Sequence, residues 1–244
     1  MYTKQKPEKI NYNRCAFIYD NCRDSKGVDI NLLYKFVHGY SKGVNITGFM
    51  NIFYKDSKGI SISLLNGATS KYDGVNIGGG NIVQGHSRGL NMSFVFNMLE
   101  NGNSGINIST ANILKADSKG VNIALLCNYN TNSKGVNIST GNIFEKDSTG
   151  INIGVIANHV EGYSKGINVG GLWNHSDNVK DFLIQYATFR NEVREENPDA
   201  FILNIGLWNE IGSKHHPFVQ VYGAKNLPRL IKNAFKRNPK KGGK

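Results

Sequence analysis

The chain has 244 residues, of which 39% are hydrophobic and 28 are glycine, and its formal net charge is +11. Because the apolar share is below the usual globular value and glycine is abundant, the composition argues against a conventional core and favours repeated thin layers. No stretch reaches about 18 consecutive apolar residues, so we expect no membrane-spanning helix.

Residues 1–22 are predicted to form an N-terminal cap, in which the stretch INYNRCAFIYD (residues 10–20) precedes the first repeat. A stack of strands exposes its terminal strands as open edges, which caps cover. The opening MYTKQKPEKINYNR lacks the apolar segment of a secretory signal. We therefore expect a cytoplasmic protein, peripherally associated with a membrane if it meets one.

Residues 23–212 are predicted to form a repeat domain. One phrase recurs at a short and nearly constant interval: a glycine, an aliphatic residue, usually Asn, then another aliphatic residue. Apolar–polar–apolar alternation is typical of a half-buried strand, and glycine permits the positive φ of a turn. The anchor glycines of these copies are Gly27, Gly43, Gly59, Gly74, Gly89, Gly105, Gly120, Gly135, Gly150 and Gly166.

Bulky and small residues alternate from copy to copy at the fifth and sixth positions after the anchor glycine. This alternation predicts a true period of about 31 residues, in which a long coil has two strand faces and large side chains meet small ones across the interior. A second possibility is that each unit forms its own coil. The bulky pairs are Leu32-Leu33, Leu64-Leu65, Phe94-Val95, Leu125-Leu126 and Val155-Ile156.

The fold class predicted from these features is an all-β solenoid of tandem 15–16-residue units, with a super-period of about 31 residues and end caps. Parallel stacking would align Asn45, Asn76, Asn107, Asn137 and Asn168 in one hydrogen-bonded ladder. The alternative is an antiparallel meander or barrel with one strand per unit. Near-constant turn lengths favour the solenoid.

Strand parity separates the two members of each bulky pair. Leu32, Leu64, Phe94, Leu125 and Val155 share the parity of the aliphatic residues in the phrase and are predicted to be buried. Their neighbours have the opposite parity and are predicted to form an outward stripe, unless the strand bends there and turns them inward. We expect such a stripe to support self-association or docking of the basic C-terminal arm. The residues of this stripe are Leu33, Leu65, Val95, Leu126 and Ile156.

Residues 213–244 are predicted to be a C-terminal cap followed by a basic arm. Eight of the 29 basic residues and none of the 18 acidic ones lie in residues 225–244, which leaves positions 1–224 with a net charge of only +3. The stretch NLPRLIKNAFKR is typical of a basic amphipathic helix, which suits an anionic membrane surface or an acidic protein. The residues predicted to bind the anionic surface or acidic partner are Lys225, Arg229, Lys232, Lys236, Arg237, Lys240 and Lys241. We expect no comparable basic stripe in the body, so nucleic acid is the less favoured partner.

Three copies, GINIGVIAN (residues 150–158), GINVGGLWN (166–174) and NIGLWN (204–209), carry a resemblance to a known family. They resemble the tandem phrases of bacterial surface-repeat proteins of the leptospiral type, with Asn in place of Gln at the key position. The similarity covers roughly residues 27–209, and it implies a repeat protein at a cell surface without a characterised activity.

Catalytic and metal-binding patterns are not evident in the sequence. Cys15, Cys22 and Cys127 lack metal-ligand spacing and are expected to be reduced thiols. No nucleophile–base set stands out, so we predict no catalytic residues, no metal site and no cofactor. The predicted function is a non-catalytic structural or binding scaffold that its basic arm attaches to an anionic surface or partner. The alternatives are a polysaccharide-active solenoid enzyme and a nucleic-acid-binding protein.

Overall fold

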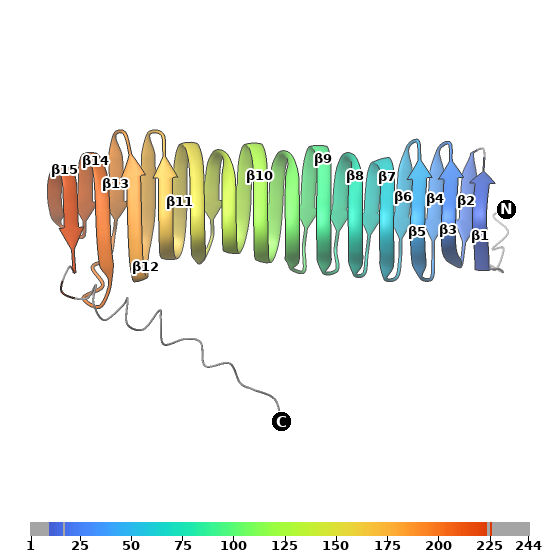
Figure 1. Cartoon of the computed structure of the whole chain (residues 1–244), viewed down its shortest axis with the longest axis horizontal. Helices are drawn as coiled ribbons and strands as arrows, with labels where there is room; N and C mark the ends of the chain where they lie inside the picture. The colour runs from blue at the N-terminus through green and yellow to red at the C-terminus, as the bar shows by residue number, and fades with distance from the viewer. Residues whose placement is uncertain (1–9, 17, 224, 226–244) are drawn as a thin grey trace, which may run out of the picture. The chain divides into compact units, whose positions relative to one another are not determined.

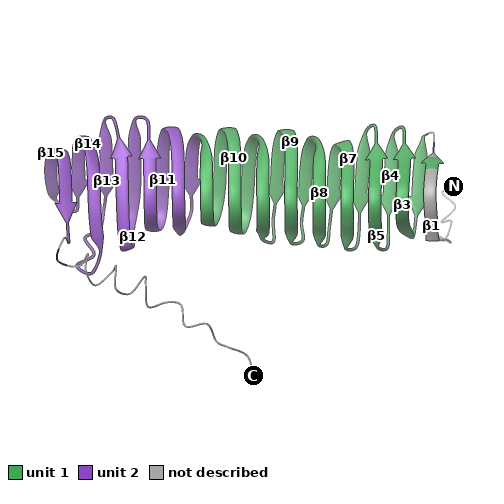
Figure 2. Ribbon diagram, viewed as in Figure 1, with its two compact units in different colours: residues 1–139 green, residues 140–244 purple. Residues whose placement is uncertain are grey.

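The computed structural model describes residues 10–16, 18–223 and 225. They form an all-β solenoid of parallel stacked coils with about 12 turns, which confirms the predicted fold class. The chain divides into two compact units, Met1–Ser139 (unit 1) and Thr140–Lys244 (unit 2), which Figure 2 distinguishes by colour.

Unit 1 is built from strands that pair in parallel with the strand segments one coil away (Figure 1). Its strands are β1 (Ile10–Ala16), β2 (Tyr19–Cys22), β3 (Asp24–Asn31), β4 (Tyr34–Val37), β5 (Ser41–Thr47), β6 (Met50–Phe53), β7 (Ser57–Ala68), β8 (Tyr72–Val83), β9 (Ser87–Leu99) and β10 (Asn103–Phe144), whose last residues belong to unit 2. The predicted N-terminal cap continues the stack, because β1 pairs in parallel with β3 and β2 pairs in parallel with β4.

Each repeat unit is one complete coil, so the expected 31-residue coil is wrong and the second possibility holds. Gly27 pairs with Gly43, and Gly43 pairs with Gly59, only one unit further along the chain. The anchor glycines stack so closely that no side chain fits. At Gly89, where φ is 120°, an added Cβ would lie 2.1 Å from the carbonyl oxygen of Gly74.

Unit 2 is also built mainly from parallel strands, but its last strand is antiparallel. Its strands are β11 (Ser148–Gly170), β12 (Trp173–Ala187), β13 (Arg190–Val193), β14 (Phe201–Ile211) and β15 (Lys214–Tyr222). Strands β11 to β14 pair in parallel, whereas β15 turns back and pairs antiparallel with β14. This reversed strand lies within the stretch predicted to form the C-terminal cap.

The interior of the coils is polar, and two ladders of asparagine run through it. In the first, each Asn side chain of unit 1 donates from Nδ2 to Oδ1 of the next, over Asn76, Asn91, Asn107, Asn122 and Asn137, with distances of 2.7–3.1 Å. We call the second strand segment of each coil, which follows the one that carries the anchor glycine, the return strand. The second ladder lies on it and runs over Asn51, Asn66, Asn81, Asn97, Asn112 and Asn128. The predicted Asn ladder is confirmed for Asn76, Asn107, Asn137 and Asn168, with further members in the coils between them. The prediction is wrong for Asn45, which lies between Asp29 and Ser61 and donates to Ser41.

Apolar side chains fill only one end of the interior. In unit 1 they form a column at the end of the return strand, and in unit 2 a second cluster includes Leu183, Ile202 and Ile211. The column in unit 1 consists of Cys22, Val37, Phe53, Ala68, Val83, Leu99 and Leu114, and Tyr72 from the start of β8 belongs to the same cluster.

The predicted burial of one member of each bulky pair is wrong. Leu32 is 50% exposed, Leu64 51%, Phe94 83%, Leu125 69% and Val155 69%. The physical reason is that Ser and Asn occupy the inward positions of both strands, where stacked amides satisfy one another. The aliphatic residues of the phrase therefore point outward and stack as columns on the outer face.

One coil replaces both ladder asparagines by an ion pair. Asp29 pairs in register with Asn45, and Lys35 with Asn51, and the two charged side chains contact each other with no exposure to solvent. The hydroxyl of Ser25 also donates to the carboxylate of Asp29. Both charges are thus paired and hydrogen-bonded inside unit 1.

Breaking this pair is expected to be costly. Lys35→Met leaves the Asp29 carboxylate buried without its cation, which should lower the free energy of unfolding by about 3–5 kcal/mol. The double variant Asp29→Asn/Lys35→Asn restores the asparagines of the other coils and should lie within about 1 kcal/mol of the parent chain. Urea unfolding of the full chain measures both. Equal losses in the single and double variants would contradict the explanation.

Candidate functional site

A column of positive charge runs along the outer face of unit 1. The residue before most anchor glycines is Lys or Arg, and register stacks these residues directly on one another, as in the series Lys26, Lys42 and Lys58. We call the set the cation column, and all of its members are exposed. It consists of Lys26, Lys42, Lys58, Arg88, Lys119 and Lys134.

Among the residues that the structure describes, no ion pair neutralises the cation column. Asp73 is the one acidic residue at an equivalent position in the stacked coils of the cation column, and it is paired with Lys71 at 2.9 Å. Nearby acids accept hydrogen bonds from the next coil instead. Asp24 accepts from the backbone N–H of Tyr40 at 2.7 Å, and Asp117 accepts from the side chain of Asn132 at 2.8 Å.

Two columns of aliphatic side chains lie beside the cation column on the same face. They come from the residues one and three positions after each anchor glycine, for example Val44 and Ile46. Side chains two residues apart on a strand point to the same side about 7 Å apart. Ile60 is 37% exposed and Ile106 is 43% exposed, so the columns present a continuous apolar band to solvent. The face can therefore contact an anionic surface that also has apolar parts.

The predicted basic arm lies almost wholly outside the described residues. Lys225 is described and exposed. Arg229, Lys232, Lys236, Arg237, Lys240 and Lys241 fall outside the described part of the chain. The cation column, by contrast, was missed, although its signal was present in the sequence as the Lys or Arg before most anchor glycines.

The predicted partner stripe is mostly exposed, but it is not a single column. Leu33 is 38% exposed, Val95 51% and Leu126 59% in unit 1, and Ile156 is 49% exposed in unit 2. Leu65 is half-buried and pairs with Met50 and Gly80 in the neighbouring column of the return strand. The coils are not all of the same length. This difference shifts the pairing register of the residues between the first strand of a coil and its return strand.

Unit 2 contains a cluster of aromatic and charged side chains on its outer face. The rings of His159 and His175 stack at 4.8 Å, and Trp173 lies 5.7 Å and 5.6 Å from them. His175 is almost fully buried between two carboxylates, with Nε2 3.0 Å from Asp177 and Nδ1 3.3 Å from Glu192. Each of these carboxylates also contacts an arginine. Ring stacking of His159 on His175 links β11 to β12, and the contact of His175 with Glu192 links β12 to β13.

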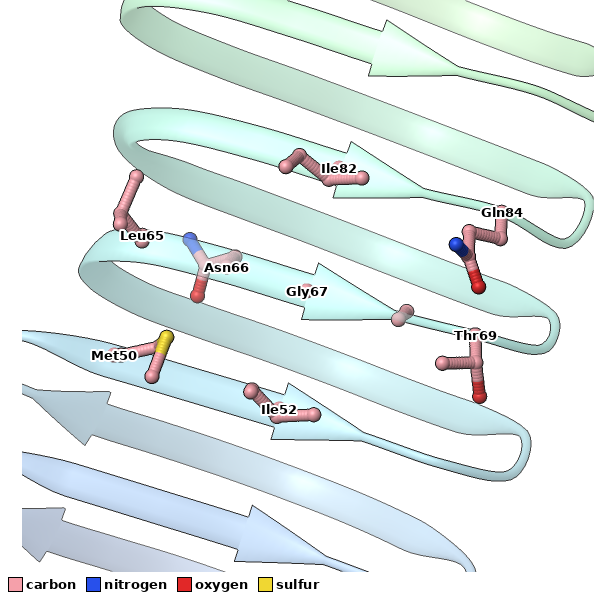
Figure 3. A pocket seen from close by; sticks show the side chains of 9 residues that line it. Met50, Ile52, Leu65, Asn66, Gly67, Thr69, Ile82 and Gln84 are labelled. Carbon is pink, nitrogen blue, oxygen red and sulfur yellow. The ribbon is translucent and has the colours of Figure 1, made fainter.

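A shallow apolar notch interrupts the return face of unit 1. Gly67 lies between Ile52 and Ile82 in one column of the return strands. Because glycine has no side chain, the column has a gap at this position. Figure 3 shows Met50 and Leu65 beside this gap, with Thr69 and Gln84 at its other side. It is large enough for an apolar side chain and has few polar groups to orient a small molecule.

Groups that could support redox, metal-binding or membrane-spanning roles are few in the described residues. None of the three cysteines forms a disulfide, and burial raises the pKa of the Cys127 thiol, which keeps it protonated and poorly nucleophilic. Burial likewise raises the pKa of Tyr72 above its usual range. Within residues 10–223, leaving out position 17, no group of three or more His, Cys, Asp or Glu side chains is arranged to hold a metal ion. The described part of the chain also has no helix of the length and apolar character that a membrane span requires.

Comparison with known proteins gives no relative from which a function could be transferred. No family model, no curated protein and no solved structure matches the chain. The resemblance to leptospiral-type surface-repeat proteins therefore stays a prediction.

The stacked histidine pair predicts a pH dependence of stability. Burial, followed by the nearby His175, lowers the pKa of His159. The unfolded chain then binds more protons at this residue as the pH falls below about 6.5, so the folded state loses stability on acidification. His159→Gln should lose less stability than the parent chain between about pH 7.5 and 5. Thermal unfolding over this range measures the difference, and His216→Gln, an exposed change in β15, is the control. A parent-like pH profile in His159→Gln would contradict the assignment.

Proposed function

We propose that the protein is a non-catalytic structural or binding scaffold that attaches to an anionic surface through positive charge. The observation that supports this proposal is the cation column beside the apolar band of unit 1. Neighbouring strands lie about 4.8 Å apart, which is shorter than the screening length of physiological salt. Stacked like charges therefore destabilise the fold unless a partner neutralises them.

The basic arm extends the same chemistry. Its eight basic residues have no acidic neighbour within residues 225–244. Each basic residue near an anionic membrane contributes on the order of 1 kcal/mol of binding, so the arm and the cation column would act together. The arm residues proposed to take part are those from Lys225 to Lys241.

An anionic lipid surface or an acidic protein fits this site better than nucleic acid does. Phosphate contacts alone require cations and make no use of the aliphatic columns beside them. An amphipathic surface, by contrast, uses both. The polysaccharide-active alternative has less support, because Asp177, Glu192 and Glu210 in unit 2 already form ion pairs.

Sedimentation with vesicles tests the proposal on the full chain. The parent protein should bind vesicles containing phosphatidylserine, in a salt-dependent way, and should not bind pure phosphatidylcholine. The column variant Lys42→Gln/Lys58→Gln/Arg88→Gln and the arm variant Lys232→Gln/Lys236→Gln/Arg237→Gln should each bind about 100-fold more weakly, since roughly a factor of five is lost per cation.

A matched control separates position from net charge. Lys115→Gln/Lys180→Gln/Lys214→Gln removes three positive charges that lie outside the column and the arm, and its binding should change much less. Absence of parent binding to anionic vesicles, or equal losses in all three variants, would overturn the proposal. Binding to duplex DNA in preference to vesicles would instead favour the nucleic-acid alternative.

A further inference from the structure

The sequence contains two Asn-Gly pairs, Asn66-Gly67 and Asn101-Gly102, and both lie in unit 1. In such a pair the backbone nitrogen of the glycine can approach the side-chain carbonyl carbon of the asparagine, because glycine has no Cβ to obstruct it. The structure places the first pair inside strand β7 and the second in the turn between β9 and β10. The two pairs therefore have the same chemistry in different surroundings.

The amide ladder restrains the first pair. Asn66 is only 4% exposed, and its Nδ2 donates to the carbonyl oxygen of Ile77 and to Oδ1 of Asn81, both at 3.0 Å. Gly67 pairs in parallel with Ile52 and Ile82, within the strand that Figure 3 shows. Moving the side chain of Asn66 onto its own backbone would leave buried polar groups without partners, which is costly.

The second pair lacks these restraints. The side chain of Asn101 is exposed, and among the described residues nothing forms a hydrogen bond with its amide group. Gly102 has a positive φ of 95°, and its N–H donates no hydrogen bond to any residue in the described part of the chain. Hydrogen bonds therefore hold neither the side chain nor the backbone nitrogen that would react with it.

The strand that follows this turn also begins without the side-chain bond that anchors other coils. The hydroxyls of Ser87, Ser118 and Ser133 each accept a hydrogen bond of 2.9–3.1 Å from the ladder asparagine four residues further on. Asn103 takes the place of serine in the coil that follows Asn101, and within the described residues neither of its amide atoms has a partner. The turn is therefore less firmly anchored than those turns.

A histidine of the preceding coil acts on the peptide group that would react. Nδ1 of His86 lies 3.4 Å from the carbonyl oxygen of Asn101. Because a carbonyl oxygen only accepts hydrogen bonds, the ring nitrogen is the donor. This contact draws electron density away from the peptide group, which favours loss of the amide proton of Gly102.

We propose that Asn101 is a modification site at which the chain deamidates itself through a succinimide. The nitrogen of Gly102 loses its proton to water and attacks Cγ of Asn101. The new N–Cγ bond closes the ring, the Cγ–Nδ2 bond breaks, and Nδ2 takes a proton from water and leaves as ammonia. Water then opens the ring. Attack at Cγ gives aspartate, and attack at the backbone carbonyl carbon gives isoaspartate. Nothing is oxidised or reduced, and water is the co-reactant.

The modification changes one turn of unit 1 and leaves its interior intact. It replaces a neutral amide by a carboxylate beside Glu100, which already pairs with Lys115 at 3.3 Å, and lowers the net charge of the chain by one. The second ladder passes from Asn97 to Asn112 without using Asn101. The converted chain should therefore remain folded.

Peptide mapping by mass spectrometry, after incubation of the full chain at mildly alkaline pH, tests the proposal. Trypsin cleaves after Lys and Arg and separates the two pairs into peptides 59–71 and 89–115. In the native chain Asn101 should convert at least about 100-fold faster than Asn66, which must first break its two ladder hydrogen bonds. In concentrated urea both pairs lose their structure and should convert at similar rates, which is the matched control.

A variant assigns the signal to this residue. Asn101→Gln keeps an amide, but its longer side chain would have to close a six-membered ring, so conversion at position 101 should disappear while thermal unfolding stays that of the parent chain. Two results would refute the proposal: equal conversion of Asn66 and Asn101 in the native chain, or an unchanged Asn101 after a time that converts the urea-unfolded chain. Neither result bears on vesicle binding by the cation column.

Discussion

Hydrogen bonding between identical amides in successive coils is the interaction on which the rest of the structure depends. An asparagine side chain inside a narrow coil can donate to one neighbouring coil and accept from the other when both present an asparagine at the same place. This requirement keeps the repeat length almost constant. It also explains why the anchor glycines align, since the ladders and the glycine files are fixed by one register.

The polar interior and the apolar surface have the same cause. When serine and asparagine take the inward positions of both strands, the alternating aliphatic residues must point outward. They recover part of their burial by stacking in columns, which leaves residues such as Ile60 and Ile106 about two-fifths exposed. Surfaces of this kind attract partners, so a solenoid built on amide ladders is suited to binding other surfaces along its length.

The sequence was sufficient to predict strands, parallel stacking and an asparagine ladder, because each depends on period and spacing alone. It did not reveal which parity faces inward, since an alternating pattern looks the same from both sides of a strand. Leu65 shows a second limit. It follows Leu64 as Val95 follows Phe94, yet it lies in a different column because its coil is shorter. Register at a corner depends on the neighbouring coil, which a single repeat does not contain.

The distribution of surface charge was the property that the sequence predicted least well. A count of acidic and basic residues does not show which of them stack on one another in successive coils. Ahead of the basic arm the chain is nearly neutral in sum, yet acids and bases occupy different places in each coil. Acids such as Asp24 and Asp117 accept hydrogen bonds from the turn of the next coil, which fixes them at one position. The described lysines before the anchor glycines of unit 1 form no ion pair, whereas Lys165 in unit 2 pairs with Asp181, and register brings those of unit 1 into one column. In a repeat protein, therefore, the charge presented to a partner is the charge of a stacked column of residues and not the net charge of the chain.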